Sequence, residues 1–208
     1  MKKYTGVWSL FFLVIICSSF LPPTSHTTKK HSKTRTWKVD IAHSHVKFAV
    51  GYMMISEVEG YFKVFSGTME QKQHDFTDAK IYFTVDVNSI NTSQEARDKH
   101  LQSDDFFNAE KYPLMTFVGN SFKSAGNMRY VLKGNLTIRD VTKPVQFDVT
   151  YGGIATNHQG DKAGFKAKTV INRFDYNLKW NSLLESGGVV VGENIEITVL
   201  IKMDEVLQ

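Results

Sequence analysis

Histidine and arginine are the side chains of this sequence whose spacing could support chemistry. His43 and His45 are two residues apart, a spacing that puts both on one side of a strand and that two ligands of a metal ion could use. No cysteine, aspartate or glutamate clearly converges on them to complete a ligand set. We therefore predict a polar pair at the start of a strand, and no metal site.

His100 offers two further kinds of chemistry. With Asp98 it could form an acid–base pair, but neighbouring helical positions diverge and no nucleophile sits in an activating motif. With Arg97 it shares a helical face, and the two could bind a phosphate or a quinone carbonyl. A solvated surface or a tether to a rim is the competing interpretation of Arg97. A metal-assisted or acid–base enzyme that uses His45 or His100 stays the alternative to a binding protein, and we predict no enzyme and no cofactor.

Two other motifs have structural interpretations. Arg173 lies in INRFDYNLKW, near several aromatic residues, and is expected to stack on a ring or to close a barrel. Gly187 and Gly188 precede an apolar run, but no lysine or helix N-terminus follows, so we expect a rim loop rather than a phosphate loop.

Arg97 and His100 lie in the one long mature segment that has a helical pattern, residues 92–113. Thr92 and Glu95 have the spacing of a capping box, which predicts a short helix beginning at Thr92. Glu95 and Lys99 can pair across one helical turn, and Pro113 ends any continuation. The aromatic residues that follow the helix indicate a lid or plug packed on a β-structure.

The rest of the mature sequence alternates apolar and polar residues with a period of two. Strands are expected around residues 46–52, 58–64 with its continuation 65–69, 81–87, 116–122, 130–138, 145–151, 163–171 and 195–201, separated by short turns, which makes about eight strands. Strands joined by short turns pair antiparallel. The economical architecture is an all-β, eight-stranded antiparallel sheet closed into a barrel, because closure removes exposed edges. A two-sheet sandwich is the alternative.

An eight-stranded barrel is just wide enough to be filled by side chains or to hold one slender ligand. The sequence pattern does not decide between a core filled by side chains and an apolar tunnel. If a ligand binds inside, the residues expected to contact it are Phe48, Val50, Phe62, Phe83, Val85, Phe107, Phe117, Leu132, Phe147, Phe165, Trp180 and Ile197.

Composition bounds the domain organisation. The chain has 208 residues, 42% apolar and 22% charged, which fits one globular domain with a processing segment. Lys2 and Lys3 followed by an apolar run are typical of a signal peptide, which we place at residues 1–25. A basic Ser/Thr-rich linker is expected at 26–36 and the barrel domain at 37–208.

Charge and cysteine content narrow the partners. Cys17 is the one cysteine, so disulfides are excluded from a processed form. It lies at the end of an apolar run, so lipidation at this residue is an alternative to ordinary cleavage or an uncleaved anchor. Removing residues 1–19 takes only Lys2 and Lys3 from the 25 basic residues and none of the 21 acidic ones. This near balance argues against a nucleic-acid partner. Contact with a membrane surface and a homodimer stay open.

Five sequence blocks carry a family resemblance. They are W-x-V-D with H-S-H-V-x-F (37–48), V-x-G-x-F with F-x-G (58–67), RDKHLQSDDFFNAEKYP (97–113), G-x-L-T-I with VTKPV (134–145) and AGFKA (163–167). In this order and spacing they resemble the YceI-like proteins of the bacterial envelope. Tyr52 stands where a His is expected, and Asn177 where many members have Gly.

The resemblance implies an exported, lipocalin-like barrel that holds an isoprenoid lipid, either a polyprenyl phosphate or an isoprenoid quinone, in an apolar tunnel. It favours the tunnel over the filled core. The expected function is noncatalytic binding, storage or transport in the periplasm, with a lipid-anchored or secreted form also open. Arg97 and His100 are the head-group candidates. A stress or adhesion protein with a filled core is a further alternative.

Overall fold

A computed structural model describes residues 33–185 and 187–207. The expected signal peptide, Cys17 and most of the expected linker lie outside the described residues. The described part contains eleven strands: β1 (Arg35–Val39), β2 (His45–Tyr52), β3 (Ser56–Phe62), β4 (Phe65–Gln71), β5 (Lys80–Asp86), β6 (Ile90–Asn91), β7 (Leu114–Gly126), β8 (Arg129–Ile138), β9 (Val141–Asn157), β10 (Gly160–Asn172) and β11 (Val191–Glu205).

Helical structure is scarce. One α-helix, α1 (Glu95–Gln102), and three short 3-10 helices, η1 (Ile41–His43), η2 (Val87–Ser89) and η3 (Arg173–Tyr176), connect the strands of the described chain. A search of the described residues for a helix with the length and hydropathy of a membrane span found none.

Eight strands close into an antiparallel barrel in the order β1-β4-β5-β7-β8-β9-β10-β11, and β11 returns to β1. β11 makes this closure possible because it has two partners on one edge. Its first part pairs with β2, from Val191 opposite Tyr52 onward, and its last residues, Met203 to Glu205, pair with β1. The sheet continues from β2 through β3 to β6. The predicted closed barrel is confirmed, and the two-sheet sandwich is wrong because all the strands of the described residues belong to one hydrogen-bonded sheet.

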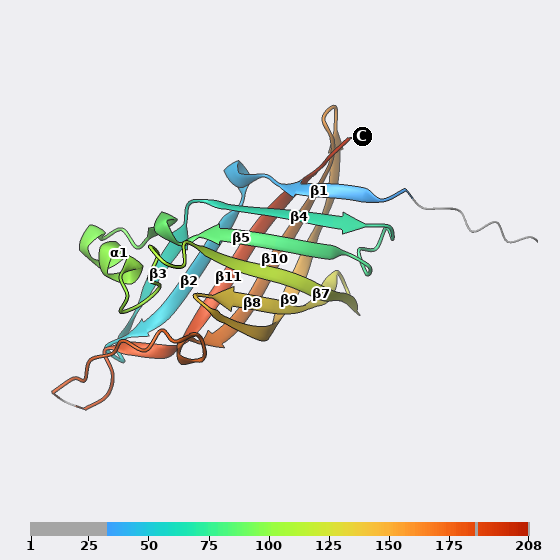
Figure 1. Ribbon diagram of the computed structural model, residues 1–208. Coiled ribbons are helices and arrows are strands. Elements are labelled where there is room, and N and C mark those ends of the chain that lie inside the picture. The colour runs from blue at the N-terminus through green and yellow to red at the C-terminus, as the bar shows by residue number, and fades with distance from the viewer. Residues whose placement is uncertain (1–32, 186, 208) are drawn as a thin grey trace, which may run out of the picture. The chain divides into compact units, whose positions relative to one another are not determined.

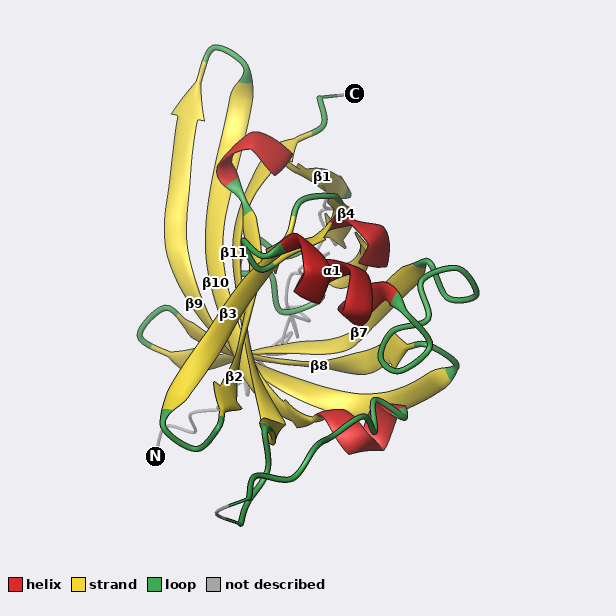
Figure 2. Cartoon of the chain, turned by 90° about the vertical axis from the view of Figure 1, so that its left-hand side faces the viewer, coloured by secondary structure: helices red, strands yellow, loops and turns green. Residues whose placement is uncertain are grey.

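Figure 1 shows α1 at one end of the barrel, beside β3, and the loop that precedes β11 at the same end. Figure 2 looks onto this end, with α1 in front of the ring of strands. We call it the mouth. The predicted helical insert therefore lies where a lid would lie.

The helix starts later than the capping box predicted. α1 begins at Glu95, and the side chain of Gln94 caps it by accepting a hydrogen bond from the Arg97 N–H. Thr92 is instead buried, and its hydroxyl and N–H both donate to Asp98 Oδ1, at 2.6 and 2.8 Å. These bonds satisfy the Asp98 carboxylate as it enters the interior. The Glu95–Lys99 pair is confirmed, at 2.7 Å.

The barrel also begins earlier than predicted. Arg35 was assigned to the linker, but it lies in β1 and donates to Glu205 at 2.7 Å and to Asp161 at 2.6 Å. Its guanidinium also lies over the Trp37 ring, 4.6 Å from the centroid. Charged groups at this seam between β1 and β11 are held in place by opposite charges rather than left to solvent.

The end opposite the mouth is closed by an aromatic plug. Phe76, in the β4–β5 connection, is 1% exposed and has a positive φ of 63°. Its ring lies 5.9 Å from Trp37, 5.3 Å from Tyr151 and 5.2 Å from Phe165, centroid to centroid. The sequence suggested only a turn here. The plug makes the barrel interior blind at this end.

Inside the barrel, three phenylalanine rings lie against glycines of a neighbouring strand. A Cβ added to Gly60 would stand 2.4 Å from Phe48 Cζ, one on Gly67 2.5 Å from Phe83 Cδ2, and one on Gly134 2.4 Å from Phe117 Cζ. Real Cβ atoms do not approach carbon this closely. The glycines therefore let large rings lie along the wall instead of across the bore.

Replacing Gly67 by alanine should therefore destabilise the barrel, because the new methyl group would displace Phe83. The expected loss is about 1–3 kcal/mol of unfolding free energy, as for other overpacked cores. Gly51 is the matched control, since a Cβ there meets nothing within 4 Å. Gly51→Ala should be neutral or stabilise by roughly 0.5–1 kcal/mol. Urea unfolding measures both, and equal effects would contradict the packing argument.

The ion pairs at the β1–β11 seam should make stability depend on acid pH. The Lys202 ammonium, 2.6 Å from Asp40, lowers the pKa of that carboxyl to about 2, and Arg35 lowers the pKa of Glu205. A pKa lower in the folded state adds stability above the unfolded value of about 3.9, which is lost as the pH falls toward the folded value. Asp40→Asn should lower Tm at neutral pH and match the wild type near pH 2. A Tm difference that stays constant across this range would count against the pair.

Candidate ligand-binding tunnel

The barrel interior is partly empty, and one chamber of the empty space lies between the mouth and the middle of the bore. This central chamber has a volume of about 150 Å³ and an almost entirely apolar lining. An engineered cavity of similar size lined by Leu, Ile and Phe stays dry and takes up benzene. The chamber is lined by Val46, Phe48, Val50, Phe62, Phe83, Val85, Leu101, Phe106, Phe107, Met115, Phe117, Leu136, Ile138, Phe147, Ile171, Arg173, Leu178, Val191, Ile195, Ile197 and Val199, with Lys47 and Thr116.

A second chamber of about 120 Å³ continues the space toward the closed end. It shares Phe83, Phe117, Phe147 and Val199 with the central chamber, so these side chains form the junction. Its remaining lining includes Val39, Met69, Ile81, Phe122, Leu132, Val149, Phe165, Ala167, Ile201 and Met203.

A third chamber of about 170 Å³ lies at the mouth. It shares Phe48, Val50, Leu101, Phe106 and Val191 with the central chamber, and adds Tyr52, Val58, Arg97, His100, Trp180 and Val190. The three chambers therefore follow one another through shared walls, from a mouth that carries polar groups to a blind apolar end. We call this row of chambers the tunnel.

The structure brings all twelve sequence-predicted ligand residues to the tunnel. Nine line the central chamber: Phe48, Val50, Phe62, Phe83, Val85, Phe107, Phe117, Phe147 and Ile197. Leu132 and Phe165 line the deep chamber, and Trp180 lines the mouth chamber. Arg97 and His100 also line the mouth chamber.

Several lining residues were missed from the sequence. Leu136 and Ile138 follow Leu132 on the same strand face, so the period of two contained the signal for them. Phe106 stands in the aromatic run after α1, but no periodicity indicates which of those rings faces inward. Val191 was missed because β11 begins at this residue, four residues before the predicted start of the strand at residue 195.

Arg97 is fixed at the mouth by Thr92. Its Nε donates to Thr92 Oγ1 at 2.7 Å and its Nη2 to the Thr92 carbonyl at 2.8 Å. Nη1 has no hydrogen-bond acceptor among the described residues. The guanidinium is therefore oriented by the protein and keeps donors for a ligand.

His100 lies on the same helix, and its ring forms a cluster with the rings of Phe106 and Trp180, which are 5.3 Å apart centroid to centroid. The centroids of Phe106 and Trp180 are each 5.1 Å from the His100 centroid, in edge-to-face geometry. Its Nε2 lies 2.9 Å from Asp105 Oδ2. His100 and Asp98 do not pair, as expected from their diverging helical positions, and Asp98 is instead bound to Thr92. His100 contributes an aromatic wall with one polar edge.

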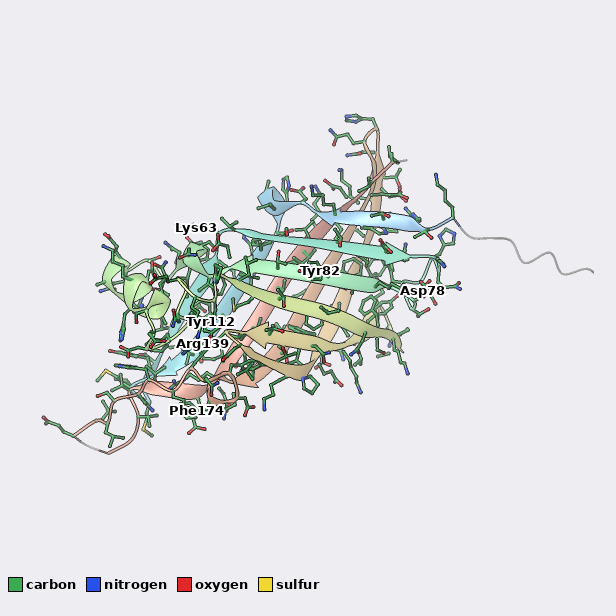
Figure 3. All side chains as sticks on the ribbon, viewed as in Figure 1. Lys63, Asp78, Tyr82, Tyr112, Arg139 and Phe174 are labelled. Carbon is green, nitrogen blue, oxygen red and sulfur yellow. The ribbon has the colours of Figure 1, made fainter. Side chains whose placement is uncertain are left out.

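Arg173 is a buried cation that borders the central chamber. It is 2% exposed, and it donates to the carbonyls of Gly192 (2.8 Å), Val191 (3.2 Å), Leu178 (2.5 Å) and Trp180 (2.8 Å). Burial lowers its pKa, and the Glu193 carboxylate partly opposes this. The predicted stacking is confirmed, because Arg173 Cζ lies 4.4 Å from the centroid of the Phe174 ring. Phe174 is labelled in Figure 3. Arg173 thus joins η3 to the start of β11.

The lid segment, residues 103–113, is tied to the barrel by a second arginine. Arg139 Nη1 donates to the carbonyls of Phe106 at 2.9 Å and Asn177 at 3.3 Å, and its guanidinium lies 5.6 Å from the Tyr112 ring. Figure 3 shows Tyr112 and Arg139 next to each other near α1. Asn177 has a φ of 60°, a conformation that glycine and asparagine tolerate.

The histidine pair does not form a site. His43 belongs to η1 rather than to a strand, and its Nδ1 lies 2.8 Å from Asp40 Oδ2, while His45 is exposed on β2. The expected same-side placement is wrong because the chain turns at η1. The described residues contain no group of three or more His, Cys, Asp or Glu side chains that could hold a metal ion.

Comparison with known proteins gives a consistent set of relatives. The family model described as "YceI-like domain" matches residues 37–203. A UPF0312 protein of Staphylococcus aureus (strain MSSA476) is 36% identical over 159 residues, which cover 76% of this chain and 90% of that protein. A UPF0312 protein of Staphylococcus epidermidis has the same identity and coverage.

Solved structures agree. BcnA of Burkholderia cenocepacia superposes with a TM-score of 0.68 at 26% identity, covering 79% of this chain and 98% of that one. The Campylobacter jejuni YCEI protein gives 0.64 at 30%, covering 76% and 90%. A polyisoprenoid binding domain from Saccharophagus degradans gives 0.59 at 16%, covering 81% and 97%, which shows a shared fold. With the sequence blocks, the closed barrel and the family match in agreement, this chain belongs to the YceI-like family.

Proposed function

We propose that this protein is a noncatalytic carrier that binds, stores or transports an isoprenoid lipid in the tunnel. The observation that carries the proposal is the row of three chambers, whose surface is almost entirely apolar inside the barrel and more polar at the mouth. A long, methyl-branched hydrocarbon chain with one polar end has the same distribution of polar and apolar groups as this row of chambers. The name of the Saccharophagus degradans domain, which refers to polyisoprenoid binding, supports the same class of ligand.

The energetics favour a long chain. Each methylene transferred from water to an apolar site contributes about 0.8 kcal/mol, so several isoprene units together exceed the cost of ordering the chain. Phe83, Phe117 and Phe147 stand at the junction of the central and deep chambers. Rotation of these rings would join the two chambers for a guest that extends to the plug.

The polar end of the ligand belongs at the mouth chamber in this proposal. Arg97 offers oriented donors there, and His100 and Trp180 offer aromatic faces. A phosphate would accept charge-assisted hydrogen bonds from Arg97, and a quinone would accept a hydrogen bond and stack on the rings. We favour the phosphate, because the Arg97 guanidinium is held in place by Thr92 before any ligand binds.

The proposed site of action is outside the cytoplasm. The signal-like residues 1–25 support export, and the basic linker or a lipid on Cys17 would keep the domain near a membrane. An extracytoplasmic carrier would move an isoprenoid lipid that water alone cannot transport.

Blocking the tunnel should remove long ligands and spare short ones. Val199 lines both the central and the deep chamber, so a tryptophan there would fill the junction between them. We expect Val199→Trp to lose long-chain lipid from an organic extract of the purified protein, measured by mass spectrometry, while still binding farnesol. Val170→Trp is the control, because Val170 is 58% exposed on the adjacent strand β10. Unchanged long-chain lipid in Val199→Trp would contradict the tunnel as the binding site.

The head group can be tested with two ligands of the same tail. Wild-type protein should bind farnesyl phosphate about ten-fold more tightly than farnesol, the size of one charge-assisted hydrogen bond. Arg97→Gln should reduce this ratio toward one without weakening farnesol. Lys99→Gln is the matched control on the same helix, since Lys99 is exposed and pairs with Glu95. Calorimetry measures the ratios, and a wild-type ratio near one would contradict the phosphate and favour an uncharged head group such as a quinone.

A further inference from the structure

The turn between β2 and β3 carries large apolar side chains into solvent. Ile55 is 87% exposed, Met54 74% and Met53 38%. Leu183, in the loop that leads to β11, is 79% exposed. Ile55, Leu183 and Met54 are the three most exposed large apolar side chains of the described residues. We call Met53, Met54, Ile55 and Leu183 the apolar lip.

The two methionines also hold an unfavourable backbone conformation. Met53 has a φ of 51° and Met54 a φ of 62°, and the Ile55 N–H donates to the Tyr52 carbonyl at 3.3 Å to close the turn. A turn with two positive φ values strongly prefers Asn-Gly, and other side chains cost folding stability there. The sequence thus places exposed, flexible apolar side chains where a small polar pair would fold better. Such a departure points to a role outside the fold.

The β2–β3 turn lies against the loop before β11, the loop that carries Leu183. The Met53 N–H donates to the Val190 carbonyl at 2.8 Å, and a Cβ on Gly188 would stand only 2.4 Å from Met54 Sδ. The hairpin and the loop are therefore in contact through main chain and side chain.

The lip is continuous with the opening of the tunnel. Tyr52 and Val190, which line the mouth chamber, stand directly beside the lip in sequence and in hydrogen bonding. The apolar lip carries no charge, so it cannot bind a partner by attraction between opposite charges. A surface that receives them must itself be apolar just below its boundary.

We propose that the apolar lip inserts into the surface of a phospholipid bilayer and holds the tunnel mouth against it while cargo passes. The inference deepens the proposed function and rests on it for the cargo, but not for the docking itself. A bilayer is the occupant favoured by continuity with the mouth, because an isoprenoid chain leaving a membrane would then reach the chambers without crossing water. Shallow apolar insertion without basic residues needs no anionic lipid and is insensitive to salt.

The docking is tested by oxidative footprinting of the full chain with and without neutral phosphatidylcholine vesicles. Met54 should be oxidised several-fold more slowly when vesicles are present. Met128 is an internal control: it occupies the same second turn position in the β7–β8 hairpin, with a φ of 60° and 52% exposure. Equal protection of the two methionines, or none, would overturn the proposal. Protection of Met54 that appears without vesicles as protein concentration rises would assign the lip to self-association instead.

A pair of variants separates docking from folding. Met53→Asn with Met54→Gly creates the preferred turn, so Tm should rise, while the rate of polyprenol uptake from vesicles should fall by about ten-fold as apolar contact is lost. Met128→Gly creates the same Asn-Gly turn after Asn127, and should raise Tm without slowing uptake. If the double variant Met53→Asn, Met54→Gly takes up polyprenol at the wild-type rate, the proposed role of the apolar lip is contradicted. Failure of the wild-type protein to take up any polyprenol would instead contradict the proposed function, while Met54 protection still reports on docking.

Discussion

The tunnel depends on the packing of phenylalanine rings against glycines of neighbouring strands. Eight strands enclose a bore that ordinary apolar side chains can fill. Phe48, Phe83 and Phe117 would cross that bore if their neighbours carried side chains, but Gly60, Gly67 and Gly134 leave room for the rings along the wall. The same aromatic residues that would make a solid core therefore make an apolar lining. The barrel is therefore hollow because glycines stand beside the large rings, and not because large residues are few.

The two ends of the bore solve different problems. At the deep end, Phe76 and its aromatic neighbours exclude water with side chains alone. At the mouth, loops must stay attached while leaving an opening. Arg139 and Arg173 hold them by donating to main-chain carbonyls of the lid segment, of the residues that follow η3 and of β11. The carbonyls satisfy donors of Arg173 without neutralising its charge, whereas Arg139 also forms an ion pair with Asp104, at 3.1 Å. The mouth consequently keeps positive charge beside an apolar chamber, which suits an amphiphile with its polar end outward.

Sequence alternation predicted the wall of the tunnel well because a strand has only two faces. Once Val46 is assigned inward, Phe48 and Val50 follow, and the cavity contains all twelve predicted residues. Prediction was poorer where no period applies. Phe76 reads as part of a turn, Thr92 fits a capping box although Asp98 binds it, and Arg35 lies in a basic stretch although Glu205 and Asp161 fix it. In each case a partner distant in sequence, or on another element, decides the outcome.

A blind tunnel imposes one route for both loading and release. With Phe76 closing the far end, cargo must enter and leave past α1, the lid segment and the turn at Met53 and Met54. Whatever surface donates the lipid and whatever surface receives it must therefore meet the same end of the barrel. An apolar lip at that end shortens the exposed path in both directions, and an opening held by arginine–carbonyl bonds can widen without breaking the sheet. The direction of transport would then follow from the relative lipid affinities of the two surfaces, since one opening serves both entry and exit.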